Sequence, residues 1–298
     1  MTRRPPADPA APPAADAVRD RAADAFLRHP GLRDALAAYC AEVALVAPAG
    51  WPINKLFNQL GRYLVGYFLV HHHRHWAHHG GPLPTLARLQ QNCPLSPRQT
   101  AGIVAGLRAG RLVETRAAPA GRARILVPAP AVTEQIAASM LGYLRAVDRL
   151  QPDRAPRAPA IAADPALQDE LVYRSAATLI ADPTLLDSYP RVVAFARRDC
   201  GYLVLAAVMA AVYAAAAGEP SPPLSYRRLA DHFRLSRSHI GNLLGTATHA
   251  GWITTDARGR LVAADPAFVA EFERWSAWQL GHHAALADAI LADRIAPA

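Results

Sequence analysis

Hydrophobic and polar positions follow one plan twice along the chain, in residues 63–113 and again in residues 202–253. Each copy opens with an apolar helical stretch that begins Tyr-Leu-Val and ends at a break rich in glycine and proline. A short helical segment, a Leu-Ser turn, a second helical segment and an Ala-Gly pair complete the plan. Self-similarity of this kind predicts two units with the same architecture.

Two strand-like runs follow the Ala-Gly pair in each copy. In the first copy they are residues 111–116 and 122–127, and in the second copy they are residues 252–255 and 260–263. Short connections that contain glycine between apolar runs are hairpin signals. Each unit is therefore predicted to fold as helix, helix, turn, helix and hairpin.

Long helices are predicted on both sides of each unit. The segments with helical periodicity are residues 19–46, 132–150, 165–181, 184–198 and 266–290. A proline-rich stretch, QPDRAPRAPA, is predicted to be extended and fairly stiff, and it separates the chain into two halves. We therefore expect a disordered tail at residues 1–18, a first domain at 19–150, a linker at 151–160 and a second domain at 161–298. The predicted fold class is mainly α with small β-hairpins.

Residues 224–262, LSYRRLADHFRLSRSHIGNLLGTATHAGWITTDARGRLV, resemble the winged helix-turn-helix of the multiple-antibiotic-resistance regulator (MarR) type of bacterial transcription factor. Leu229 and Ala230 fit the first helix of that motif, residues 236–240 fit the start of its recognition helix, and Gly251 fits the glycine before its hairpin, the wing. The resemblance implies a DNA-binding transcriptional regulator with two tandem winged helix-turn-helix modules flanked by long helices. Such helices form the dimer interface in that family, so the halves would pair as a pseudo-dimer or the chain would form a homodimer.

The first copy departs from this motif. Pro97 stands at the start of its second helix, Gly102 and Gly106 weaken that helix, and one residue is missing before Gly110. We therefore expect the second copy to be the main reader of DNA sequence.

The position of the basic charge is more informative than its total of +8 over 298 residues. Residues 83–127 contain seven arginines and one acid, and residues 224–262 contain six arginines and two acids. These segments carry +6 and +4, so the remaining residues sum to −2. Basic charge gathered in two segments of a near-neutral chain is typical of a polyanion-binding surface. Double-stranded DNA is the expected partner.

Candidate DNA contacts lie on the outward face of the second helix of each copy and on the hairpins. Ser236 is the expected N-cap, and the expected buried faces are Ile240, Leu243, Leu244 and Ala247 in the second copy and Ile103, Val104 and Leu107 in the first. The outward candidates are Arg237, Ser238, His239, Gly241 and Asn242, with Arg98, Gln99 and Arg108 in the first copy. The hairpin candidates are Arg116, Arg122, Arg124, Arg258 and Arg260. Arginine can bond guanine bidentately and asparagine can bond adenine, whereas hairpin arginines suit phosphates.

One apolar stretch raises the question of a membrane. Residues 200–218 carry no charge over 19 positions, which meets the length criterion for a membrane span. Alanine dominates the stretch and contributes little to insertion, and the repeat aligns the stretch with one that contains Arg74. We therefore predict a buried interior helix and no membrane. The three cysteines form no CxxC pair and no apolar segment follows the basic N-terminus, so a cytoplasmic protein is expected.

Six of the twelve histidines form one cluster: His71, His72, His73, His75, His78 and His79. On a continuous helix, His71, His75 and His78 share a face, and imidazoles at this spacing can chelate a borderline metal ion. Histidines that fray at a helix end are the simpler interpretation, and titration near neutral pH is an intermediate one.

No catalytic motif stands out in the sequence. It contains no phosphate-binding glycine loop, GxSxG or HExxH, so a metal-dependent hydrolase built on the histidines is the one enzyme interpretation, and we predict neither enzyme activity nor a cofactor. Two alternatives share the predicted architecture. A tandem winged-helix plasmid replication initiator would bind repeated origin sequences, and a winged-helix scaffold would bind proteins only. The operator and any small-molecule effector stay open.

Overall fold

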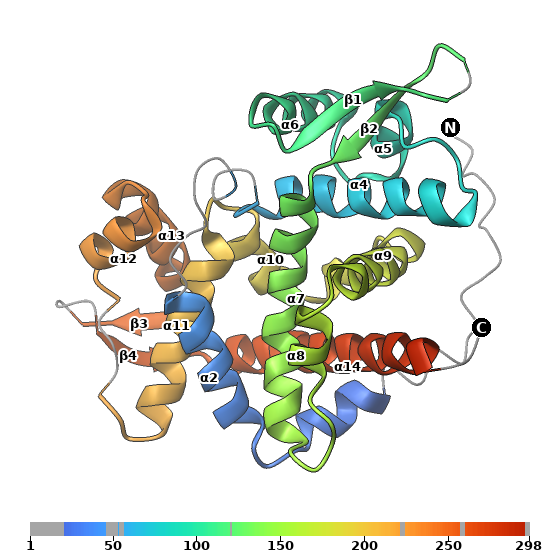
Figure 1. Ribbon diagram of the computed structural model, residues 1–298. Helices are drawn as coiled ribbons and strands as arrows, with labels where there is room; N and C mark the ends of the chain where they lie inside the picture. Colours follow the sequence, from blue (N-terminus) through green and yellow to red (C-terminus); the bar gives the residue numbers. More distant parts are fainter. Residues whose placement is uncertain are drawn as a thin grey trace.

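The computed structural model describes residues 21–45, 53, 57–119, 121–220, 224–256 and 260–295. Within these residues the chain is mainly helical, and its strands form two antiparallel two-stranded hairpins (Figure 1). The predicted class, mainly α with small β-hairpins, is confirmed. The predicted tail at residues 1–18 and residues 257–259 of the second hairpin turn lie outside the described residues.

Both copies of the repeat fold with the predicted order of elements. The first unit, residues 60–128, consists of α4 (Leu60–His79), α5 (Leu86–Asn92), α6 (Pro97–Ala109), β1 (Val113–Ala117) and β2 (Arg124–Pro128). The second unit, residues 201–264, consists of α11 (Gly201–Ala216), α12 (Tyr226–Phe233), α13 (Arg237–His249), β3 (Ile253–Thr255) and β4 (Leu261–Ala264). A long helix follows each hairpin, α7 (Pro130–Leu150) after the first and α14 (Pro266–Ile295) after the second.

The remaining elements precede the two units. They are α2 (Leu32–Leu45) before the first unit and α8 (Arg157–Ala162), α9 (Pro165–Ala181), η1 (Leu185–Ser188) and α10 (Pro190–Ala196) before the second. α9 has the predicted bounds, because the Asp164 carboxylate accepts a hydrogen bond from the Ala166 amide at 2.9 Å and Pro165 suits the first helical position. The single helix predicted at residues 184–198 is instead divided into η1 and α10. The division falls at Tyr189 because Pro190 disfavours helical backbone at the residue before it.

Two of the helices that precede the units, α2 and α9, are exchanged between them. α2 packs against α11 of the second unit, and α9 packs against α4 of the first. Leu36 of α2 is accordingly buried in one core with Val204 of α11. Leu171 of α9 is buried in a second core with Val65 of α4. Each hydrophobic core therefore draws on both halves of the sequence.

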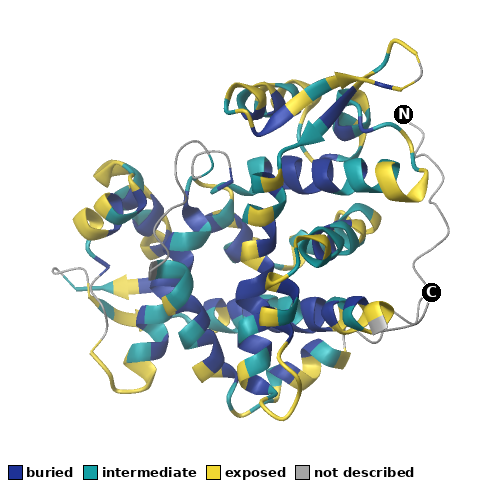
Figure 2. Cartoon of the chain, viewed as in Figure 1, coloured by how far each residue is buried: buried dark blue, intermediate teal, exposed yellow. Residues whose placement is uncertain are grey.

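A central bundle carries the two units. α7 and α14 pack against each other, and α2 and α9 pack against this pair. Figure 1 shows α5, α6 and the first hairpin above the bundle and α12, α13 and the second hairpin to its left. Burial follows the same division, since buried residues fill the bundle while exposed residues are frequent on α6 and α12 (Figure 2).

The proline-rich segment at residues 151–160 differs from the extended linker predicted for it. Residues from Arg157 onward form α8, and the Asp148 carboxylate accepts hydrogen bonds from the amides of Arg157 and Ala158, both at 2.9 Å. The Arg157 side chain is only 3% exposed and donates to the Asp288 carboxylate of α14 at 2.6 and 3.0 Å. Composition alone indicated stiffness, but these carboxylates fold the segment onto the bundle.

The apolar stretch at residues 200–218 forms α11, which is buried along most of its length, as predicted. Val204, Leu205, Val208 and Met209 are fully covered by neighbouring helices. Among the described residues, none of the helices combines the length and the apolar character that crossing a membrane requires.

Candidate nucleic-acid interface

α13 begins and packs as its sequence predicts. The Ser236 hydroxyl accepts a hydrogen bond from the His239 amide at 3.1 Å, which satisfies one of the free amides at the helix start. The predicted apolar face is confirmed, and its four buried residues are Ile240, Leu243, Leu244 and Ala247. The opposite face leaves Arg237, Ser238 and Asn242 exposed.

Two other candidates on α13 are engaged within the protein. The His239 ring lies with Nε2 3.0 Å from the Asp199 carbonyl oxygen, so this side chain is turned toward the chain before α11. A Cβ atom at Gly241 would lie 3.4 Å from the ring of Tyr226 on α12, so the close approach at this glycine is to an aromatic ring. Tyr226 is itself 46% exposed and lies beside the outward face of α13. Sequence reasoning missed Tyr226 because its place in the motif gave no periodic signal.

α6 repeats the construction of α13 in the first unit. The Ser96 hydroxyl accepts from the Gln99 amide at 3.3 Å, and Gln99 Oε1 accepts from the Ser96 amide at 3.2 Å, which completes a capping box. Gln99 is exposed, but its carbonyl oxygen is engaged in the cap. Arg98 and Arg108 are exposed on the outward face. The buried residues are Thr100, Val104 and Leu107, so Thr100 takes the place predicted for Ile103, which is only half-buried.

The two helices have equal lengths and end in the same way. Each has 13 residues, and the Leu112 amide donates to the Leu107 carbonyl at 2.8 Å as the Trp252 amide donates to Ala247 at 2.9 Å. The glycine of the first copy does come one residue earlier after the capping serine, but the helix is not shorter, because the glycine is displaced relative to the helix end. Arg111, with φ +57°, occupies the left-handed position that Gly251 occupies with φ +73°. A non-glycine residue in this conformation costs about 1 kcal/mol, and Arg111 is exposed.

The hairpin arginines are mostly paired. Arg116 donates to the Glu114 carboxylate at 2.9 and 2.7 Å, Arg124 donates to the Thr115 carbonyl at 3.2 Å, and Arg260 donates to the Asp256 carboxylate at 2.9 Å. Arg258 lies outside the described residues. Among the predicted arginines in the described part of the chain, those without a side-chain partner are Arg98, Arg108, Arg122 and Arg237. We call these four the unpaired arginines, and two of them lie in the first turn of α6 and α13, where the helix dipole also favours anions.

Three members of the histidine cluster, His71, His75 and His79, lie along the side of α4 that faces Tyr173 of α9. α4 continues through the cluster to His79, so the histidines do not fray. His71 and His79 stack on the Tyr173 ring with centroids 4.8 Å away, and His75 Nδ1 lies 3.1 Å from the Tyr173 hydroxyl. Arg74 joins the same two helices through ion pairs with Asp169 and Glu170.

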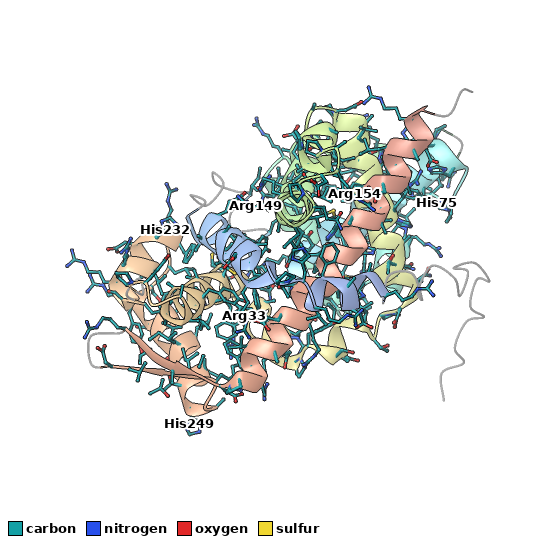
Figure 3. All side chains as sticks on the ribbon, turned by 90° about the horizontal axis from the view of Figure 1, so that it is seen from below. Arg33, His75, Arg149, Arg154, His232 and His249 are labelled. Atoms are coloured by element: carbon teal, nitrogen blue, oxygen red, sulfur yellow. The ribbon has the colours of Figure 1, made fainter. Side chains whose placement is uncertain are left out.

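The metal hypothesis for His71, His75 and His78 gains no support from this arrangement. Among the described residues there is no group of three histidine, cysteine or carboxylate side chains that could hold a metal ion. The stacked set is His71, His75 and His79, and it does not include His78. Figure 3 shows His75 at the opposite end of the molecule from His232 and His249 of the second unit.

Burial keeps part of the cluster uncharged. It lowers the pKa of His71 and of His73, and it lowers the pKa of His72 to about 3. His72 Nε2 is buried, and it has no hydrogen-bond partner in the described part of the chain. These three imidazoles are neutral at pH 7, so their titration would not change the charge of the first unit near neutral pH.

We expect acid to destabilise the protein partly through His72. Its pKa is about 3 in the folded state and about 6.5 in the unfolded chain, so the unfolded state binds an extra proton below pH 6.5. The unfolding free energy should therefore fall with decreasing pH, by about 1 kcal/mol from this residue between pH 7 and pH 5.5. Urea denaturation of the wild type and of His72→Phe at both pH values measures it. The variant should lose that part of the pH dependence, and equal slopes in both proteins would contradict the assignment.

Comparison of the chain with known protein families, curated proteins and solved structures finds no match.

Proposed function

We propose that the chain is a DNA-binding transcriptional regulator of the cytoplasm that uses two winged helix-turn-helix modules. One observation carries the proposal: the same Ser-capped helix of 13 residues occurs twice, followed each time by a hairpin and exposing unpaired arginine on its outward face. Both copies lie in the two basic segments of an otherwise near-neutral chain. The resemblance of residues 224–262 to MarR-type regulators points the same way.

In this proposal α13 is the main reader of base sequence. Arg237 suits bidentate bonding to guanine, Asn242 suits adenine, and Ser238 between them is small enough to let the backbone approach a groove. Arg98 and Arg108 on α6 supply a second contact. The hairpins supply less than the sequence predicted, because a guanidinium already paired with Glu114 or Asp256 must exchange that partner for a phosphate.

The two modules act as an intramolecular pseudo-dimer in this proposal. The exchange of α2 and α9 between the units, around the α7 and α14 pair, supports this arrangement. In a homodimer the two paired units belong to two separate chains, whereas here one chain supplies both. One chain would then present two DNA-contacting surfaces without a second copy. The resemblance left a homodimer open as well, and the intramolecular arrangement is the one that the packing favours.

The test is direct binding to double-stranded DNA across a range of salt concentrations. Fragmented genomic DNA should bind, and the logarithm of the association constant should fall with the logarithm of salt concentration with a slope of about −4, or steeper, for the four unpaired arginines. Sequencing of the retained fragments separates a regulator from a replication initiator, since promoters favour the first and repeated origin sequences the second. A protein-only scaffold would retain no DNA at physiological salt, and that result would overturn the proposal.

A further inference from the structure

A short turn at residues 197–200 joins the end of α10 to the start of α11. We call it the bridging turn. In the described part of the chain, no helix or strand of the first unit packs extensively against one of the second, so the bundle carries both. The bridging turn forms a direct link as well, because it has polar contacts with the start of the first unit and with α13 of the second.

The first unit holds the bridging turn through residues at the start of α4. Arg62 Nη1 donates to the Asp199 carboxylate at 2.8 Å, and Gln59 Nε2 donates to the Arg197 carbonyl at 3.0 Å. Because the side chains of Arg62 and Asp199 are both about one third exposed, their ion pair contributes more to geometry than to stability.

The backbone of the bridging turn has little freedom to move by itself. Cys200 takes the left-handed conformation with φ +52°, and a Cβ atom at Gly201 would lie 1.8 Å from the Phe195 carbonyl oxygen. The Cys200 amide donates to the Asn58 carbonyl at 2.8 Å, and Asn58 Nδ2 donates back to Cys200 Sγ at 3.4 Å. A displacement of the segment before α4 would therefore move the whole turn.

The second unit contacts the bridging turn through the end of α13 that carries Arg237. His239 Nε2 lies 3.0 Å from the Asp199 carbonyl oxygen, and because a carbonyl only accepts, the imidazole donates. The His239 amide donates to the Ser236 hydroxyl, so this imidazole belongs to the first turn of α13. Asp199 thus bonds Arg62 of α4 with its side chain and His239 of α13 with its backbone.

We propose that the bridging turn couples the two units and fixes the position of α13 relative to α4. Arg62, Asp199 and His239 are then positioning residues, which act through α13 rather than by reading DNA. The consequence for DNA rests on the function proposed above, since the coupling would set the distance and angle between the surfaces of α6 and α13. Each base pair of B-DNA advances by about 3.4 Å and turns by about 35°, so a fixed arrangement selects one separation of the two contacted segments.

The position of α13 relative to the first unit can be measured without DNA. Ala109 of α6 and Thr248 of α13 are exposed and the three native cysteines are buried, so spin labels attach to cysteines introduced at these two positions. Double electron–electron resonance on the full chain should give one narrow distribution of distances between the labels. Arg62→Asp should at least double the width of that distribution. His239→Leu, which removes the donor to the Asp199 carbonyl, should do the same.

Matched variants separate coupling from a general loss of packing. Arg62→Asp combined with Asp199→Arg restores opposite charges and should restore the wild-type width. His239→Gln keeps a side-chain N–H donor and should stay narrow. Arg33→Asp makes the same charge change in an ion pair of equal length, 2.8 Å, between α2 and α14, and should leave the width unchanged. Unfolding curves establish that the variants fold.

An unchanged width in either folded variant, Arg62→Asp or His239→Leu, would overturn the coupling. Failure of both the exchanged pair and His239→Gln to keep the wild-type width would overturn it too, because the broadening would then reflect lost packing.

DNA binding tests the consequence separately. On the preferred genomic fragment, hydroxyl-radical footprinting of the wild type should show two protected segments at a fixed separation. Arg62→Asp should keep the segment contacted by α13, lose the other and bind at least threefold more weakly, whereas Arg33→Asp should match the wild type. A wild-type footprint in Arg62→Asp, despite a broadened distance distribution, would overturn the DNA consequence alone. Failure of the wild type to bind DNA would refute the regulator, while the resonance measurement still decides the coupling.

Discussion

Replacing Arg237 with alanine should weaken binding to the preferred DNA sequence by about 1–3 kcal/mol and relax discrimination at one base pair. Arg237 is exposed in the first turn of α13, and its guanidinium has no partner in the described part of the chain, so the interaction with DNA displaces no ion pair. Asn242→Ala should have an effect of similar size at another base pair. Binding titrations on the preferred and on random DNA at several salt concentrations measure both the affinity and the discrimination.

Two matched arginines serve as controls for this prediction. Arg122 has no partner and lies near the hairpin turn, so Arg122→Ala should weaken preferred and random DNA alike and reduce the salt slope by about one phosphate contact. Arg116 is paired with Glu114, so Arg116→Ala should have a smaller effect than Arg122→Ala. If Arg237→Ala and Asn242→Ala leave affinity intact while Arg98→Ala abolishes it, the two modules have the opposite roles. If none of these changes matters, the DNA-binding proposal is wrong.

Replacing Arg157 with alanine should destabilise the folded protein by about 2–3 kcal/mol. The guanidinium is 3% exposed and bonds the Asp288 carboxylate of α14, so its removal leaves that carboxylate without its buried partner. The expected loss is below the usual range for a broken buried ion pair because the Asp288 side chain is 49% exposed and water can solvate it. Urea denaturation followed by far-ultraviolet circular dichroism measures the loss.

Arg154 provides the matched control, because it faces the same carboxylate from a solvated position. Its guanidinium lies 3.7 Å from the Asp288 carboxylate, and its side chain is 64% exposed. Arg154→Ala should therefore cost less than about 1 kcal/mol. Equal losses in the two variants would show that burial of Arg157 contributes nothing, and that the segment at residues 151–160 does not depend on this ion pair.

The element order was predictable because the signals for it are local. Ser96 and Ser236 mark helix starts, and the glycines and the apolar spacing that follow them predict helix lengths and buried faces without knowledge of any distant residue. The same local signals predicted α9 with its observed bounds, since Asp164 and Pro165 lie next to one another at its start.

The partners of those faces were not predictable from one sequence. The apolar spacing around Leu171 on α9 is the same whether that helix packs against its own half or against α4 of the other half. The sequence pattern therefore contains no signal for the exchange of helices. His239 and Gly241 failed as candidates for the same reason, because the Asp199 carbonyl and the Tyr226 ring come from other elements. The structural role of Arg157 could not be predicted from its proline-rich segment, because the folding of that segment depends on carboxylates from α7 and α14.

The exchange of α2 and α9 also sets an order of events during synthesis. Tyr39 of α2 and Tyr202 of α11, whose hydroxyls are hydrogen-bonded, are 163 positions apart in the chain. At translation rates of about 5–20 residues per second, α2 waits on the order of ten seconds for its partner helix to leave the ribosome. The first unit likewise waits for α9 to complete its core. The nascent chain therefore carries two incomplete apolar surfaces until its second half has been made.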